Sequence, residues 1–428
     1  MALLKKINAW LHLWLGLVSG IVVVILGITG CILVFEQEIK SLSSPWLHVQ
    51  KPANGSYLPP SALYKEVKKA FPEKEIRSAF YYGAERTVRM SMNSDTLVYV
   101  NPYTAEIVAM VDHEDFFHFI EEGHFHLWLP EAIGGPIVGW ATFVFFILLI
   151  TGLILWWPKN LKRSSVNKSF KIKWRAKFKR VNYDLHNVLG FYAVIISLVF
   201  AITGLIMSFA WFSNAFFVAT GGTIKERIIS KSDTTLHNTL VPLSQVDMAW
   251  EKGITEIGEY NKDAIIVSFP QKASDVIALC VDMRNGVWRY VNLDQHSLEP
   301  VASTQKKMKD EDFALYLRRS NYTLHVGAFG GLPVKILFFL ASLICASLPV
   351  TGFLVWWGKK KKSVRKNRLN NQKHNMPDML CLLQINISSF LPNFASLVKS
   401  TSIHRKLRQI TGNETKKKYR KMLLPVFD

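Results

Sequence analysis

Four long apolar stretches constrain this chain more than any other feature of its sequence. A helix needs about 20 apolar residues to cross the hydrocarbon core of a bilayer. Stretches of that length run through Leu11–Phe35, Ile137–Trp157, Leu189–Phe212 and Val334–Trp357. The first is followed by Glu36 and Glu38 rather than by a small-residue cleavage site, so we expect it to remain as a helix. The sequence therefore predicts a membrane protein with four transmembrane helices.

The positions of lysine and arginine predict how these helices are oriented. The formal net charge is +20, and the basic residues gather before the first stretch, between the second and third, and after the fourth. By the positive-inside rule, these three segments belong on the cytoplasmic side of the membrane. Both termini are then cytoplasmic. Because the charge acts as a topology signal, we expect no nucleic-acid partner.

This orientation divides the chain into alternating membrane and aqueous segments. The membrane helices are expected within residues 1–36, 132–158, 185–213 and 329–358. Residues 37–131 and 214–328 are long enough to fold outside the membrane, and residues 159–184 form a basic cytoplasmic loop. The basic, polar tail of residues 359–428 is expected to be disordered.

The two halves of the chain repeat one pattern. The first and third stretches match from a histidine through a glycine at +4 to a Thr-Gly pair at +17 and +18. The matching positions are His12 and His186, Gly16 and Gly190, Thr29-Gly30 and Thr203-Gly204. The second and fourth stretches match as ITGLILWWPK and VTGFLVWWGK. This order of motifs indicates a duplicated unit of helix, outer domain and helix.

Both outer segments have the pattern of small α+β domains. Each starts with a predicted helix, Ser61–Phe71 or Leu243–Ile254, and Ser61 is the expected N-cap of the first. Three short β-rich runs follow in each. They are Ala79–Tyr82, Val88–Met92, Leu97–Val100, Ala264–Phe269, Val276–Val281 and Trp288–Leu293. The fold class is therefore a membrane α-helical protein with two small α+β extracytoplasmic domains.

Histidines near the ends of the predicted helices are the candidate functional residues, because an ionisable residue at membrane depth is costly. His12 and His186 should lie near the cytoplasmic face. His325, with either His124 or His126, should lie near the outer face. Each pair has the donors to supply two axial imidazoles to the iron of one b-type haem.

Small residues follow each of the two helical histidines on its own helix face. They include Gly16 and Gly30 after His12, and Gly190 and Gly204 after His186. A small-residue face admits a porphyrin, but it also admits a closely packed helix. By helical rise, Gly30 and Gly204 should lie near the outer pair. Gly152 and Gly352, in the second and fourth stretches, should lie near the inner pair.

These blocks resemble the PepSY-associated transmembrane family. The resemblance covers about Lys5–Lys362 and includes GHFHLWLPEAIGGPIVGW and LHVGAFGGLPVK. It implies a bacterial inner-membrane protein with two periplasmic PepSY domains. The most similar members are ferric-siderophore reductases that carry two b haems. The resemblance carries the ligand positions over to His12, His186, His325 and His124, with His126 as the alternate to His124.

The sequence and the resemblance together predict an oxidoreductase in contact with membrane lipid. It would take electrons from an unidentified cytoplasmic or membrane donor and reduce a ferric siderophore or another ferric complex outside. A siderophore or haem permease subunit is an alternative that needs a polar cavity near midmembrane. A regulatory PepSY protein that binds a peptide or a peptidase is another, and it needs no membrane histidines.

Overall fold

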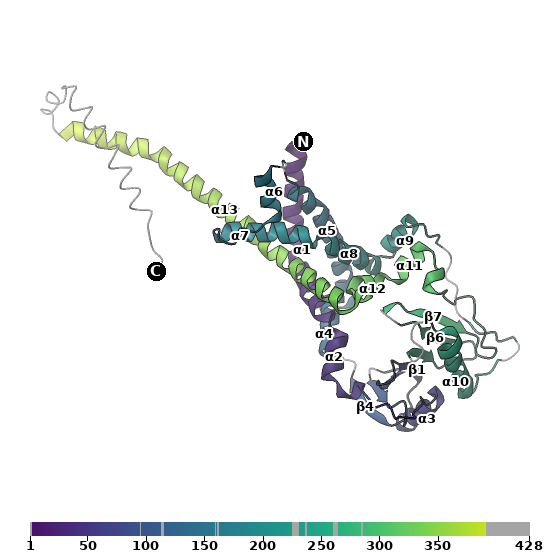
Figure 1. Cartoon of the computed structure of the whole chain (residues 1–428). Coiled ribbons are helices and arrows are strands. Elements are labelled where there is room, and N and C mark those ends of the chain that lie inside the picture. The colour runs from purple at the N-terminus through teal and green to yellow at the C-terminus, as the bar shows by residue number, and fades with distance from the viewer. Residues whose placement is uncertain are drawn as a thin grey trace. The chain divides into compact units, whose positions relative to one another are not determined.

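The computed structural model divides the chain into two compact units, Met1–Trp356 and Trp357–Asp428. It describes residues 2–94, 96–112, 115–158, 160, 162–224, 231–235, 238–259, 264–283 and 286–390. The first unit contains a bundle of long helices and a β-sheet (Figure 1). The candidate histidines all belong to this first unit.

The long helices confirm the four predicted spans. They are α1 (Ala2–Leu33), α5 (Glu131–Trp156), α8 (Gly190–Ser208) and α13 (Gly331–Phe390). Helix α7 (Phe178–Asp184) and η2, a π-helical turn at Leu185–Leu189, lead directly into α8. Within the described residues, four segments are long and apolar enough to cross a membrane: Leu3–Leu33, Glu131–Trp156, Phe178–Ser208 and Ala328–Lys360.

Helix α13 differs from the prediction because it continues beyond residue 358 to Phe390. The first part of the tail that was expected to be disordered is therefore helical. Lysine, arginine and leucine favour helix, and no proline interrupts the sequence between Trp357 and Pro377. Residues 391–428, the rest of that predicted tail, lie outside the described residues.

Helix α5 packs against both α1 and α8, and so does α13. Where α1 meets α13, a Cβ added to Gly27 would lie only 2.8 Å from the Cβ of Ala346. Ser342 also donates a hydrogen bond to the Gly27 carbonyl (2.9 Å). Where α8 meets α13, Ser197 Oγ lies 3.0 Å from Cys345 Sγ. Small residues thus bring these helices into close contact, as expected for a bundle in lipid.

Short helices mark the two ends of the bundle. At the end that carries the segment between α5 and α8, which we call the loop end, lie α6 (Arg163–Phe170) and α7. At the sheet end lie α2 (Glu36–Ser43), α4 (Phe116–His126), α11 (Phe313–Arg319) and α12 (Asn321–Val326). Other short helices are η1 (Pro45–Leu47), α9 (Ala210–Ala219), η5 (Met308–Asp310) and η6 (Ala328–Gly330).

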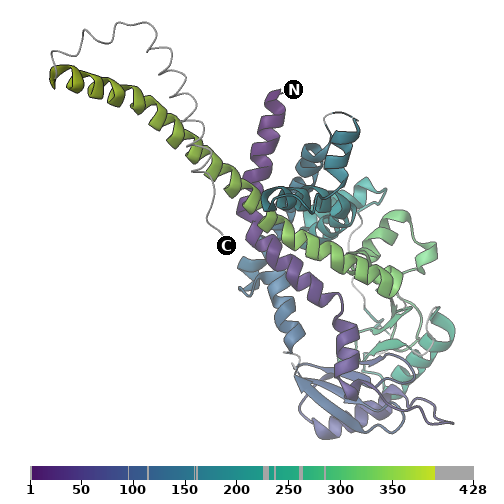
Figure 2. The same cartoon turned by 60° about the vertical axis from the view of Figure 1, so that its left-hand side comes forward.

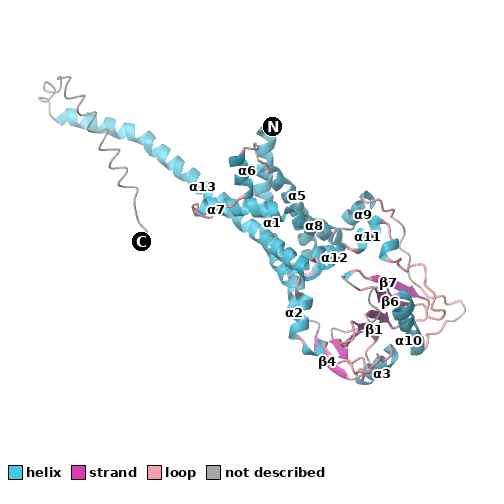
Figure 3. Cartoon of the chain, in the orientation of Figure 1, coloured by secondary structure: helices cyan, strands magenta, loops and turns pink. Residues whose placement is uncertain are grey.

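The sheet in the described part of the chain has seven antiparallel strands in the order β4-β3-β2-β1-β5-β6-β7 (Figure 3). The strands are β1 (Ile76–Tyr81), β2 (Val88–Met92), β3 (Thr96–Val100), β4 (Ile107–Asp112), β5 (Ile265–Ser268), β6 (Ile277–Val281) and β7 (Arg289–Leu293). All six predicted strands are present, and β4 is an additional edge strand. Helix α3 (Pro60–Ala70), helix α10 (Leu243–Lys252) and the turn η3 (Gly253–Ile257) pack on one face.

The two predicted outer domains share this one sheet. Strands β1 and β5 pair directly, with Ala79 opposite Val267 and Tyr81 opposite Ile265. Their core is also shared, since Leu63 of α3 and Val246 of α10 belong to one buried apolar cluster. The outer segments are therefore joined through the sheet rather than folded as two separate sheets.

The predicted N-cap of the first outer helix is wrong. Helix α3 begins at Pro60, with Pro59 as its N-cap and no side-chain cap hydrogen bond. Proline is favoured at the first helical position because its fixed φ suits the helix and it has no N–H to satisfy. Asp247 of α10 accepts a hydrogen bond from the Ser61 N–H (2.8 Å), so the cap comes from the other half of the chain.

Candidate functional site

His12 and His186 face each other near the loop end of the bundle. His12 lies on α1, and His186 lies in the π-helical turn η2 that precedes α8. Their ring centroids are 6.4 Å apart and their planes cross at 79°. A π-helical turn is rare and occurs often at functional sites, because it re-aims a side chain within a helix. The structure thus brings the predicted inner pair together, and we call it the loop-end pair.

His124 and His325 form a matching sheet-end pair. His124 lies on α4 and His325 on α12, with ring centroids 6.3 Å apart and planes crossing at 65°. His126 is two residues further along α4, a rotation of about 200°, and its Nδ1 lies 3.4 Å from a carboxylate oxygen of Glu122. Of the two alternatives, the structure therefore places His124, not His126, opposite His325.

Tight turns hold α4 and α12 against the ends of the long helices. Leu127 and Trp128 both have positive φ (57° and 56°) and reverse the chain immediately after His126. A Cβ on Gly134 would lie 1.9 Å from the His126 carbonyl oxygen, so only glycine allows this approach. Helix α12 ends similarly at Gly327, where φ is 71°. These backbone features fix the positions of His124 and His325.

Each of the four histidines contacts a threonine on a neighbouring long helix. The Nδ1–Oγ1 distances are 2.9 Å for His12 and Thr151, 3.0 Å for His186 and Thr351, 2.8 Å for His124 and Thr29, and 2.7 Å for His325 and Thr203. The same arrangement thus occurs at all four positions, and each contact joins two helices of the bundle.

The threonines assign the same ring tautomer to all four histidines. Each threonine hydroxyl donates to the carbonyl four residues earlier in its own helix, as Thr29 does to Ile25 (2.8 Å) and Thr151 to Ile147 (2.9 Å). Its oxygen then accepts a hydrogen bond from the histidine Nδ1–H. This leaves Nε2 as the nitrogen with an available lone pair, which is the form that binds a metal.

The glycine after each threonine lies beside the histidine ring. A Cβ on Gly152 would be 3.0 Å from Cε1 of His12, and a Cβ on Gly352 would be 3.1 Å from Cε1 of His186. At the sheet end, the corresponding distances to His124 and His325 are 3.4 Å from Gly30 and 3.9 Å from Gly204. The predicted placement of all four glycines is therefore correct.

Gly16 and Gly190 make looser contacts than the other glycines of the predicted small-residue faces. The nearest atoms to an added Cβ are methyl groups of Leu148, at 3.8 Å from Gly16, and of Leu348, at 3.5 Å from Gly190. These are side-chain contacts, whereas Gly27 of the same α1 face touches the backbone of Ala346. The interpretation as a closely packed helix face is therefore confirmed at Gly27, and the porphyrin interpretation stays a prediction.

The spacing of each histidine pair leaves room for one metal ion between the two rings. A metal–imidazole bond of about 2.0 Å, with about 1.2 Å from nitrogen to ring centre, would place the ring centroids on opposite sides of a metal about 6.4 Å apart. The observed separations are 6.4 and 6.3 Å. Among the described residues, no group of three or more His, Cys, Asp or Glu side chains could hold a metal ion.

Burial keeps the sheet-end pair in the neutral form that a metal requires. It lowers the pKa of His124 from 6.5 to about 4. Burial, and then the charge of His124, lower the pKa of His325 to about 3. Both rings are thus neutral at pH 7, since that pH is well above either pKa.

The threonine partners are the residues that sequence reasoning missed. Thr29 and Thr203 stood in the repeated pattern, but no role was predicted for them. Their signal was present, because a Thr-Gly pair occurs in all four long helices, at Thr29, Thr151, Thr203 and Thr351. Four copies of one dipeptide at matched positions indicate a shared contact.

Comparison with known proteins yields a family match that spans most of the chain. The model of the PepSY-associated TM region matches residues 9–359. The matched residues include all four histidines of the two pairs and all four Thr-Gly pairs. No curated protein matches the chain.

Proposed function

The chain belongs to the PepSY-associated transmembrane family, and on that basis we propose that it is a dihaem membrane protein that reduces ferric iron. The observation that carries this proposal is the repeated site. In each of two histidine pairs the ring centroids face each other, 6.4 Å apart in one pair and 6.3 Å in the other. The Nδ1 of each ring contacts a threonine hydroxyl, and its Nε2 is available. Two b-type haems bound there would supply one-electron transfer near each end of the bundle.

The chain's own residues would hold each cofactor in three ways. The histidines offer Nε2 from two different helices, so that a ligand between them joins the halves of the bundle. The threonines fix the ring orientation, as outer partners of metal-bound histidines generally do. Gly30, Gly152, Gly204 and Gly352 keep side chains away from the rings, and the apolar helices exclude water.

Reduction would take place at the sheet end, with electrons entering at the loop end. The loop end carries the basic segment between α5 and α8, which supports a cytoplasmic position for it and an inner-membrane location for the protein. The sheet would then lie outside, as a pair of PepSY-like domains built by duplication. The matching order of α3 with β1–β3 and α10 with β5–β7 supports that origin.

The proposed reaction transfers one electron to each ferric ion. The donor is a cytoplasmic or membrane-bound reductant, and the acceptor is a ferric siderophore or another ferric complex. No bond to the protein forms or breaks. Ferrous iron is less charged and softer than ferric iron, so a chelator with hard oxygen donors holds it less tightly. Reduction therefore promotes release of the metal from its chelator.

A permease is less well supported than an electron carrier. It would need polar groups that line a path near midmembrane. The buried hydroxyls at that depth, Ser19 and Ser197, donate to the carbonyls of Leu15 and Ala193 in their own helices. They are thus used within the helices.

A pyridine-haemochrome assay and an absorption spectrum of the purified protein test the proposal. We expect two haems per chain with a low-spin bis-histidine spectrum. A folded preparation from haem-replete cells that contains no haem would refute the proposal.

A further inference from the structure

The two faces of the sheet differ, because α3 and α10 pack on only one of them. Residues alternate between the two faces of a strand, and α3 and α10 occupy the face that contains Ala79, Tyr81 and Val291. Aromatic and basic residues occupy the other face, which we call the aromatic face. It consists of Phe80, Tyr82, Arg89, Tyr99, Trp288 and Tyr290. Tyr82, Trp288 and Tyr290 are 41%, 42% and 44% exposed, so these three side chains of the aromatic face reach solvent.

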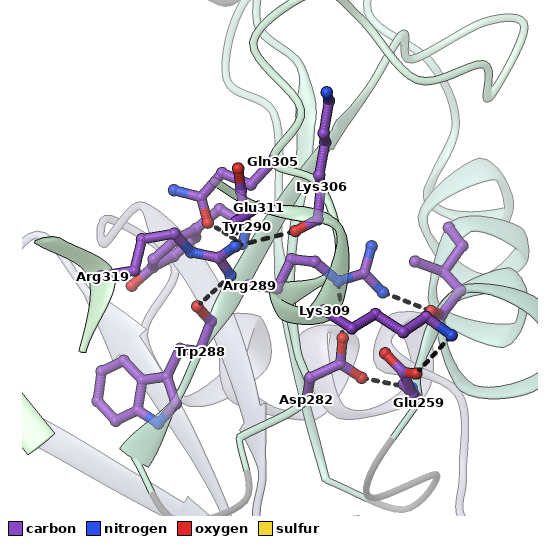
Figure 4. Close-up of polar contacts among 11 residues, drawn as sticks. Glu259, Asp282, Trp288, Arg289, Tyr290, Gln305, Lys306, Lys309, Glu311 and Arg319 are labelled. Atoms are coloured by element: carbon purple, nitrogen blue, oxygen red, sulfur yellow. Dashed lines mark hydrogen bonds and ion pairs between the residues drawn. The ribbon is translucent and has the colours of Figure 1, made fainter. Parts of the chain in front are cut away.

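Contacts at the β7 side tie the aromatic face to the helix that carries His325. Thr323 of α12 donates to the Gly286 carbonyl (2.7 Å), in the turn before β7. Arg319 of α11 donates to the Trp288 carbonyl (3.0 Å), and its other nitrogen pairs with Glu311 (2.8 Å). Figure 4 shows Trp288, Tyr290 and Arg319 on one side of β7, with Asp282, Glu259 and Lys309 on the other.

Contacts at the opposite side tie the aromatic face to the helix that carries His124. Arg86, just before β2, donates to Ser41 Oγ of α2 (3.0 Å). Lys40 of α2 pairs with Asp115, the N-cap of α4 (2.8 Å), and the charges of both act on Tyr99. The aromatic face is thus anchored on both sides to helices of the sheet-end pair. The two views agree that the sheet lies at this end of the bundle (Figures 1 and 2).

The aromatic face has an excess of positive charge. The Arg89 guanidinium lies 4.0 Å from the ring centre of Phe80. The charges of Arg89 and Arg86 both act on the Tyr82 side chain, so both arginines lie near this tyrosine. Lys40 is neutralised by Glu36 and Asp115. Among the described residues, neither Arg86 nor Arg89 has a carboxylate within ion-pair distance.

We propose that the aromatic face is the docking surface for the ferric complex, and that the complex it selects is an anion. This inference rests on the proposed function. Two arginines without carboxylate partners attract a negatively charged chelate and repel a cationic one. Arg89 is the central residue, because it stands on β2 between Phe80 of β1 and Tyr99 of β3. Its Nε is buried and has no hydrogen-bond partner among the described residues, so no carboxylate of the protein offsets its charge there.

Binding of redox-inert gallium complexes tests this inference without any electron transfer. Equilibrium dialysis against the full-length protein in detergent would measure the dissociation constants of two complexes. One is the anionic gallium(III) citrate complex, and the other is the cationic gallium(III) desferrioxamine B complex. We expect the wild-type protein to prefer the citrate complex at 50 mM salt and to lose that preference at high salt. Arg89→Gln should weaken citrate binding about tenfold, the scale of one charge-assisted hydrogen bond, and should not affect the cationic complex.

Two further variants control the experiment. Arg89→Lys keeps the charge and should retain most of the citrate binding. Arg163→Gln makes the same change at the loop end and should leave citrate binding unaltered. Unchanged haem content reports that each variant is folded. Equal affinity of the wild-type protein for the two gallium complexes, or full citrate binding by Arg89→Gln, would overturn the inference. If the same protein still contained two haems per chain, the proposed function would stand. Absence of haem would instead overturn the proposed function.

Discussion

Replacement of Thr203 by valine tests how the structure holds its histidine rings. His325 Nδ1 lies 2.7 Å from Thr203 Oγ1, and no other hydrogen bond of this nitrogen is found among the described residues. His186 differs, because its Nδ1 lies 3.0 Å from Thr351 Oγ1 and also 3.1 Å from the Leu348 carbonyl oxygen. The same Thr→Val change should therefore have unequal effects at the two ends of the bundle.

The expected magnitudes follow from the acceptors that remain. Valine at position 203 leaves the buried His325 N–H without an acceptor, which costs about 1–3 kcal/mol, or about 5-fold to 150-fold in haem affinity. Valine at position 351 leaves the Leu348 carbonyl in place. The loss there should be about 1 kcal/mol or less, which corresponds to about 5-fold.

Haem transfer to an excess of apomyoglobin measures the two affinities. Each variant is compared with the wild-type protein, and electron paramagnetic resonance reports which haem is lost. Thr203→Ser restores an acceptor and should return the affinity of the sheet-end pair to near the wild-type value. If Thr203→Val and Thr351→Val lose haem equally, or if Thr203→Ser does not rescue, then the hydrogen bonds do not set the strength of ligation.

Three further results are expected. His124→Ala should reduce the haem content from two per chain to one, whereas His126→Ala should leave two; the reverse result in the haemochrome assay would contradict the pairing seen here. Gly152→Ala places a methyl group 3.0 Å from the His12 ring and should lower haem occupancy at the loop end, while Gly204→Ala, at 3.9 Å, should have little effect on the spectrum. His12→Ala membranes should fail to reduce an external ferric complex with a cytoplasmic donor, yet the dithionite-reduced variant should still do so in a stopped-flow experiment; wild-type rates in intact cells would show that the two sites do not act in series.

The membrane part of the fold was predictable because its signals are local and strong. An apolar stretch of about 20 residues has few alternatives to a spanning helix, and helical rise alone placed Gly30 and Gly152 at opposite ends of the bundle. The choice of His124 over His126 was not decided by spacing within the chain. This choice depends on the direction in which α4 enters the turn that follows it. The positive φ angles of Leu127 and Trp128 in that turn set the direction.

The outer segments were predictable strand by strand but not as an assembly. Strand β2 alternates apolar Val88, Met90 and Met92 with polar residues, which predicts a half-covered strand, and its buried residues follow that alternation. Nothing local indicates that β1 pairs with β5, because their partners are more than 180 residues apart. Strand β4 was missed because Ile107–Val111 is apolar throughout, and a short apolar run does not distinguish strand from helix by its period.

The β1–β5 pairing limits the order in which the protein can be made. Synthesis proceeds from the N-terminus, so β1 is made long before β5, with two long apolar helices between them. During that interval the free edge of β1 exposes unpaired backbone groups, which is the usual starting point for aggregation. Half of the outer core is also missing until α10 arrives. The sheet can therefore be completed only after the first three of the four long helices have been made. A chain that stalls before Ile265 would leave the edge of β1 unpaired and prone to aggregation.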